Sequence, residues 1–99
     1  MVQIVPNWAD LEGEVVGVEP SDRLPDFTVV RVRVEKVTPV EGYADLLENC
    51  RGQVVAVLVR NEVAAAHGVD LGAHITCRAR RADHRTVFAH PTLFETRGT

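Results

Sequence analysis

The stretch that decides the fold is FTVVRVRVEKV, residues 27–37. Within it, valines alternate with charged residues, in the order Val30, Arg31, Val32, Arg33, Val34, Glu35. Alternate side chains of a β-strand point to opposite faces, so this period of two places one face in a core and the other in water. We therefore predict a strand over 27–37, with the valines buried and the charged side chains exposed.

Four further segments are predicted as strands, because the chain contains 18 valines and β-branched residues favour strands. They span residues 14–19, 54–59, 73–81 and 86–94. Gly17 inside the first segment predicts a bulge or a sharp bend. The segment 54–59 is apolar throughout, so we expect it to be covered on both faces or strongly curved.

One short helix is predicted over residues 61–67. Asn61 is a residue type that often caps helix N-termini, Glu62 suits the first turn, and Gly68 favours termination. Residues 43–50 are predicted to form two short helical turns, with their apolar side chains facing inward. The sequence thus predicts an all-β fold with one short helix between the third and fourth strands.

The turn that joins the last two strands, near residues 82–85, decides which face carries Phe88. An even number of turn residues places Phe88 opposite Ala79 in the core, whereas an odd number places it opposite Arg80 on the surface. Burial of a phenylalanine side chain is worth roughly 1.5–3 kcal/mol, so we expect the even register.

The order and lengths of these elements, with the Gly17 bulge, resemble the oligonucleotide/oligosaccharide-binding fold (OB-fold) over residues 11–94. The resemblance implies a partly open barrel of five strands. We accordingly expect an N-terminal arm over residues 1–10 and one OB-like domain over residues 11–99. The alternatives are another small barrel, or an α+β sandwich in which 43–50 is a full helix.

Composition narrows the function. The chain has 99 residues, a formal net charge of −3 and a pI near 5.7, so its global field does not attract nucleic acid. Its apolar runs are shorter than the ~20 residues of a membrane-spanning helix, so we expect no membrane partner. Its start lacks the pattern of a secretory signal. We expect a cytoplasmic protein whose two cysteines are reduced thiols.

Catalytic and metal-binding motifs are absent from the sequence. There is no Cys-x-x-Cys or His-x-x-x-His pair of the kind that zinc sites use, and Ser21 is the only serine. We therefore expect no enzyme activity, no metal and no cofactor.

The OB-fold resemblance implies a ligand that crosses the second and third strands, usually single-stranded nucleic acid. The arginines expected to meet its phosphates, and the aromatic residue expected to stack on a base, are Arg31, Arg33, Arg78, Arg80, Arg81, Arg85 and Phe27. A merely solvated strand face is the other interpretation of these residues. The alternative function is a protein-interaction or oligomerising barrel (a subunit, adaptor or homodimer) without a nucleic-acid role. A small-ligand site beside Tyr43 or Trp8 is a third.

Overall fold

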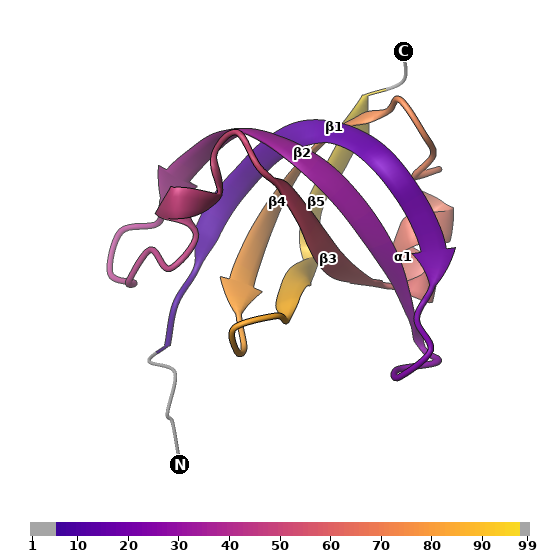
Figure 1. Cartoon of the computed structure of the whole chain (residues 1–99), viewed down its shortest axis with the longest axis horizontal. Helices are drawn as coiled ribbons and strands as arrows, with labels where there is room; N and C mark the ends of the chain where they lie inside the picture. Colours follow the sequence, from indigo (N-terminus) through magenta and orange to yellow (C-terminus); the bar gives the residue numbers. More distant parts are fainter. Residues whose placement is uncertain (1–5, 98–99) are drawn as a thin grey trace.

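The computed structural model describes residues 6–97 of the chain. Within that range the elements are β1 (Ala9–Pro20), β2 (Phe27–Pro39), the 3-10 helix η1 (Glu48–Cys50), β3 (Val54–Arg60), α1 (Asn61–Ala66), β4 (His74–Arg81) and β5 (Val87–Arg97). Figure 1 shows β1 and β2 as long, curved strands that run side by side, with α1 following the end of β3.

The five strands close into a ring in the order β1-β2-β3-β5-β4. Neighbours are antiparallel except β3 and β5, which run parallel and pair only at Val57–Val87 and Leu58–Phe88. This arrangement confirms the predicted all-β class, with five strands and one short helix between β3 and β4. The short β3–β5 contact is the narrowest seam of the ring.

The core fills the inside of the ring, and β2 supplies its centre. Val30, Val32 and Val34 are at most 1% exposed, while Arg31 and Arg33 face solvent. This confirms the two faces predicted for the strand. Burying each valine side chain stabilises the fold by about 1.5–3 kcal/mol, and this gain holds β2 in one register.

The first strand begins earlier than the sequence predicted. β1 starts at Ala9 rather than residue 14, and Ala9 and Leu11 are buried in the core. The buried Asn7 side chain exchanges two hydrogen bonds with the backbone of Arg81, at 2.9 and 2.7 Å. Ala9 and Asp10, which the prediction assigned to the N-terminal arm, therefore lie in β1.

Two glycines let β1 curve closely against β2. The predicted bulge at Gly17 is confirmed by a register shift between Val15 and Gly17, and a second shift occurs between Glu12 and Gly13. A Cβ on Gly13 would overlap the backbone carbonyl of Arg33. Only glycine therefore fits this approach without a backbone shift.

The segment between β2 and β3 contains little helix. Of the turns predicted over residues 43–50, only the three-residue η1 forms, and Leu47 and Cys50 are buried beneath the ring while Leu46 is partly buried. The alternative α+β sandwich, with a full helix over 43–50, is wrong.

The helix α1 ends at Ala66, one residue before the predicted end, and Asn61 does not cap it. Instead, the Asn61 side chain donates to the carbonyl of Pro25 at 2.9 Å and accepts from the Thr28 hydroxyl at 2.8 Å. Asn61 therefore fastens the β1–β2 loop to the start of α1.

The register expected for the last hairpin is wrong. Residues 82–86 separate the pair Arg81–Val87, an odd number, and Phe88 lies opposite Arg80. Val87 takes the core position instead, with 2% exposure. Phe88 still buries part of its ring by packing against neighbours on the outer surface, so its outward placement loses only part of the free energy of burial.

Candidate functional site

The outer surface of β2, β3 and β5 carries a continuous set of apolar side chains. Val29 pairs with Leu58 across β2 and β3, Leu58 pairs with Phe88 across β3 and β5, and Phe88 pairs with Arg80 across β5 and β4. Val29, Leu58 and Phe88 are each partly exposed. A row of four side chains therefore crosses four strands and ends at a guanidinium.

Two aromatic rings and two arginines form a second set on the same outer surface, and it shares Phe88 and Arg80 with the first. We name this second set the aromatic row: Arg60, Phe27, Phe88 and Arg80. The rings of Phe27 and Phe88 meet edge to face with their centroids 5.4 Å apart. The guanidinium of Arg60 lies 5.3 Å from the centre of the Phe27 ring, and that of Arg80 lies 5.1 Å from the Phe88 ring. Each distance is within the ~6 Å range of a cation–π interaction.

A cavity of about 430 Å³, which we name the outer pocket, adjoins the aromatic row. Its lining comes from the end of β1, the β1–β2 loop, β2, β3 and the β4–β5 loop: Glu19, Pro20, Ser21, Asp22, Arg23, Leu24, Val29, Ala56, Leu58, Arg85 and Thr86. The pocket shares Val29 and Leu58 with the row of paired side chains that crosses β2, β3, β5 and β4. Its volume lies in the ~300–1,000 Å³ range of pockets that hold small ligands.

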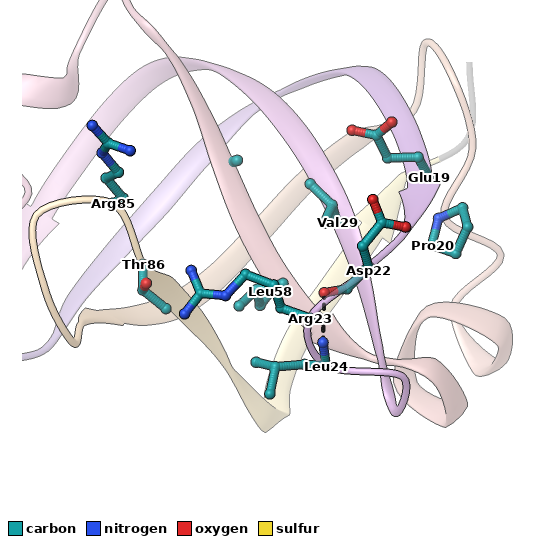
Figure 2. Close-up of a pocket in the computed structure, with 11 residues that line it drawn as sticks. Glu19, Pro20, Asp22, Arg23, Leu24, Val29, Leu58, Arg85 and Thr86 are labelled. Carbon is teal, nitrogen blue, oxygen red and sulfur yellow. Dashed lines mark hydrogen bonds between the residues drawn. The ribbon is translucent and has the colours of Figure 1, made fainter.

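The charged side chains around the outer pocket are segregated. Figure 2 shows the carboxylates of Glu19 and Asp22 together on one side and the guanidiniums of Arg23 and Arg85 on the other, with Leu58 between. The pocket thus offers acceptors on one side, cations on the other, and an apolar floor.

Local hydrogen bonds shape both loops of the pocket. The Ser21 hydroxyl accepts from the backbone N–H of Leu24 at 3.1 Å, closing the β1–β2 loop. Asp83 accepts from the backbone N–H of Arg85 at 2.8 Å. This hydrogen bond, with further ones from Thr86, lowers the pKa of Asp83, to which the positive charge of Arg23 also contributes. The two arginines therefore project from ordered turns.

Two of the predicted phosphate ligands, Arg31 and Arg33, face outward from β2 as expected, but each is paired with a carboxylate of β1. Arg31 forms an ion pair with Glu19, and Arg33 with Glu14 at 2.9 Å. Their charge is already balanced, so these arginines attract an anion less than unpaired ones do.

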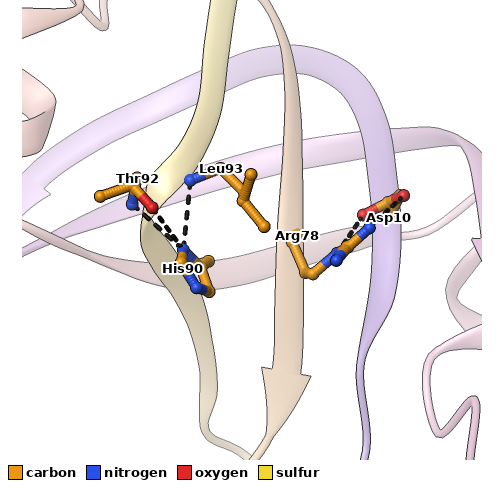
Figure 3. A network of polar contacts seen from close by, with 5 residues as sticks. All are labelled: Asp10, Arg78, His90, Thr92 and Leu93. Carbon is orange, nitrogen blue, oxygen red and sulfur yellow. Dashed lines mark hydrogen bonds and ion pairs between the residues drawn. The ribbon is translucent and has the colours of Figure 1, made fainter. Parts of the chain in front are cut away.

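Arg78 lies away from the β2–β3 face. It projects from β4 toward β1, where its Nε donates to Asp10 at 3.0 Å, and this hydrogen bond raises the pKa of Arg78 (Figure 3). On the neighbouring β5, the His90 ring nitrogen accepts from the backbone N–H groups of Thr92 and Leu93, both at 3.1 Å. Arg78 is therefore engaged with β1, whereas Arg80 on the same strand contacts Phe88 of β5.

Arg81 connects the β4–β5 turn to the segment before β3. Its guanidinium donates to the carbonyls of Leu46 and His84, at 3.2 and 3.0 Å, and to the sulfur of Cys50 at 3.3 Å. Since these donors are directed at protein acceptors, Arg81 holds the β4–β5 turn against the segment before β3. Of the seven predicted site residues, Phe27, Arg80 and Arg85 adjoin the aromatic row and the outer pocket.

Arg23 and Arg60 were not predicted as site residues, and Phe88 was predicted to lie in the core. Arg60 ends β3 opposite Phe27. This position could have been suggested by pairing the two strands from their sequence patterns. Phe88 depends on the turn length, and Arg23 depends on where the β1–β2 loop folds. Neither the turn length nor the fold of the loop produces a periodic pattern in the sequence.

Within residues 6–97, no group of three or more His, Cys, Asp or Glu side chains could hold a metal ion. Cys50 and Cys77 are free and buried, and burial raises the pKa of the Cys77 thiol to about 12. None of the helices in this range is long and apolar enough to cross a membrane.

Neither protein-family models nor curated proteins yield a match to this chain.

Proposed function

We propose that the chain is a non-enzymatic binding module that holds single-stranded nucleic acid across the outer surface of β2, β3 and β5. The observation that carries the proposal is the aromatic row beside a pocket with cationic side chains. Proteins that bind single strands combine exposed rings, on which bases stack, with positive charges along the backbone path. The resemblance to the OB-fold, which stays a prediction, implies a ligand in the same place.

Each part of the surface has a distinct task in this proposal. Bases stack on the exposed parts of Phe27 and Phe88, and such stacking is worth about 1–3 kcal/mol per base. Phosphates meet Arg60, Arg80, Arg23 and Arg85. No carboxylate within residues 6–97 forms an ion pair with any of these four.

The net charge of the chain shapes the expected affinity. With a formal charge of −3, the protein repels a polyanion at long range, so attraction comes from the local cations alone. Contact with three or four phosphates gives an affinity that falls with salt, with a logarithmic slope of about −0.7 per phosphate. We expect weak, salt-sensitive binding in a cytoplasmic setting.

A second candidate, an oligomerising or protein-interaction barrel, has its own observation. Val54 at the start of β3 is 55% exposed, and β5 pairs with β3 only at Val57 and Leu58. Within the described range, the 54–56 backbone thus has no strand neighbour on its β5 side, and such an edge can pair with another chain.

Fluorescence anisotropy of a labelled oligothymidylate of about 12 nucleotides tests the main proposal. We expect binding at about 50 mM salt that weakens steeply by about 200 mM. Phe27→Leu, which keeps an apolar side chain but removes the ring, should weaken binding roughly fivefold or more. Leu71→Ala, a change to an exposed residue outside the site, should leave it unaltered.

Absence of binding at low salt would remove the nucleic-acid proposal. Sedimentation of the same sample then decides the second candidate, since a dimer that Val54→Lys dissociates supports strand pairing at the β3 edge.

A further inference from the structure

The outer pocket contains a carboxylate that the phosphate contacts do not explain. Asp22 is exposed on the β1–β2 loop and lines the pocket beside Glu19 (Figure 2). An anionic side chain here repels a phosphate, yet it stands opposite the guanidinium groups of Arg23 and Arg85. A ligand that suits both sides must carry an anion at one end and hydrogen-bond donors at the other.

The two carboxylates differ in how far they are already engaged. Glu19 forms an ion pair with Arg31. Asp22 forms no ion pair with any cation of residues 6–97. An ionised carboxylate only accepts hydrogen bonds and has capacity for several. Asp22 is therefore the group of the pocket most available to accept from a ligand.

From this arrangement we propose that Asp22 determines base specificity, selecting a base with N–H donors on its pairing edge, above all guanine; this rests on the proposed function. Guanine presents two adjacent donors, N1–H and the N2 amino group, which a carboxylate accepts in parallel. Thymine presents a single donor between two carbonyl oxygens, which a carboxylate repels. The base lies over Val29 and Leu58, and its phosphate meets Arg23 or Arg85.

The apolar floor increases the discrimination. Hydrogen bonds made over partly dehydrated apolar surface are stronger than those in open water, and a mismatched acceptor there is left unsatisfied. A well-placed pair of hydrogen bonds to a base edge discriminates by roughly tenfold or more.

The test compares strands of about 12 nucleotides that are all thymidine except for one central position. That position carries thymine, guanine, or hypoxanthine, which keeps N1–H but lacks the N2 amino group. For the unaltered protein we expect the guanine strand to bind roughly tenfold more tightly than the thymine strand, with hypoxanthine between them.

Asp22→Asn should abolish this preference, because the amide places a donor beside the guanine donors. Asp26→Asn is the matched control, since it removes the same charge from the same loop at an exposed residue outside the pocket lining. We expect Asp26→Asn to keep the preference and to gain slightly in affinity for every strand. Asp22→Asn should gain slightly for the thymine strand and bind the guanine strand no more tightly than the thymine strand.

Equal binding of all three strands by the unaltered protein would overturn the specificity proposal and leave the proposed function intact. A preference that survives Asp22→Asn would also overturn it. Failure of every strand to bind would instead refute the proposed function.

Discussion

Two outer surfaces of this ring are rich in arginine, yet they expose opposite chemistry. One, which we name the ion-paired wall, lies on β1 and its neighbours β2 and β4, where carboxylates of β1 face cations: Asp10–Arg78, Glu12–Lys36, Glu14–Arg33 and Glu19–Arg31. The other is the aromatic row, where Arg60 and Arg80 face phenylalanine rings. The difference in what the cations contact originates in the neighbouring strand.

β1 alternates acidic and inward-facing residues along its first half and carries Glu19 near its end. The neighbouring cations that meet these carboxylates are Arg78, Lys36, Arg33 and Arg31. Arg60 of β3 instead lies opposite Phe27 of β2, and Arg80 of β4 lies opposite Phe88 of β5, so these two cations meet aromatic rings. Exposed ion pairs contribute only about 0–1 kcal/mol each to stability. The main consequence of the wall is therefore electrostatic: it neutralises arginines that would otherwise attract anions.

The largest expected effect comes from breaking the ion-paired wall at its tightest point. Gly13→Ala places a Cβ against the Arg33 carbonyl, so β1 must shift from β2 at a loss of roughly 3 kcal/mol in the free energy of unfolding. Gly17→Ala is the control, because its Cβ meets only the flexible Arg31 side chain at 3.2 Å. Urea unfolding followed by circular dichroism measures both; equal losses would contradict this account.

Arg81 tests whether an arginine near the aromatic row acts on the ligand or on the fold. Arg81→Lys keeps the charge but loses the planar set of donors to Leu46, His84 and Cys50. We expect a loss of about 2 kcal/mol in unfolding free energy. Unchanged stability with weakened binding of a single strand would instead make Arg81 a ligand contact.

A pair of substitutions compares the two surfaces directly. Arg85→Gln removes an unpaired cation beside the outer pocket, so we expect several-fold weaker binding of a single strand and a salt slope reduced by about 0.7. Arg33→Gln removes a cation already paired with Glu14, and should change affinity by less than about twofold. Anisotropy titrations at several salt concentrations measure both. Equal effects on affinity would show that pairing with a carboxylate does not weaken the attraction of an arginine for phosphate.

The smallest expected effect concerns pH and the loop that carries Arg85. Folding lowers the pKa of Asp83, chiefly through the hydrogen bond from the Arg85 backbone, so its carboxylate contributes stability at pH values above its pKa in the unfolded chain. That contribution is lost as pH falls through the lower folded value. Asp83→Asn should therefore be slightly less stable at neutral pH and equal to the unaltered protein in strong acid. Thermal unfolding at several pH values measures this, and a difference that grows in acid would contradict it.

Some of this architecture could be predicted because its cause is local. The alternation of valine and arginine over residues 27–37 specifies which face of β2 is buried, and Gly17 marks a bulge in β1. Other features are not local. The five-residue turn places Phe88 outside, and Asn61 bonds to the β1–β2 loop instead of capping α1. Short-range preferences do not describe partners that lie far away in the chain.

By itself, the sequence determined the strand class, the buried face of β2 and the presence of a short helix, because hydrophobic periodicity and valine content act within a few residues. Only the tertiary structure decided which arginines keep an available charge. That outcome depends on the register between β1, β2 and β4, and on the pairing of Arg60 with Phe27 and Arg80 with Phe88. Charge neutralisation requires a carboxylate within a few ångströms, and strand pairing brings such groups together from opposite ends of the chain.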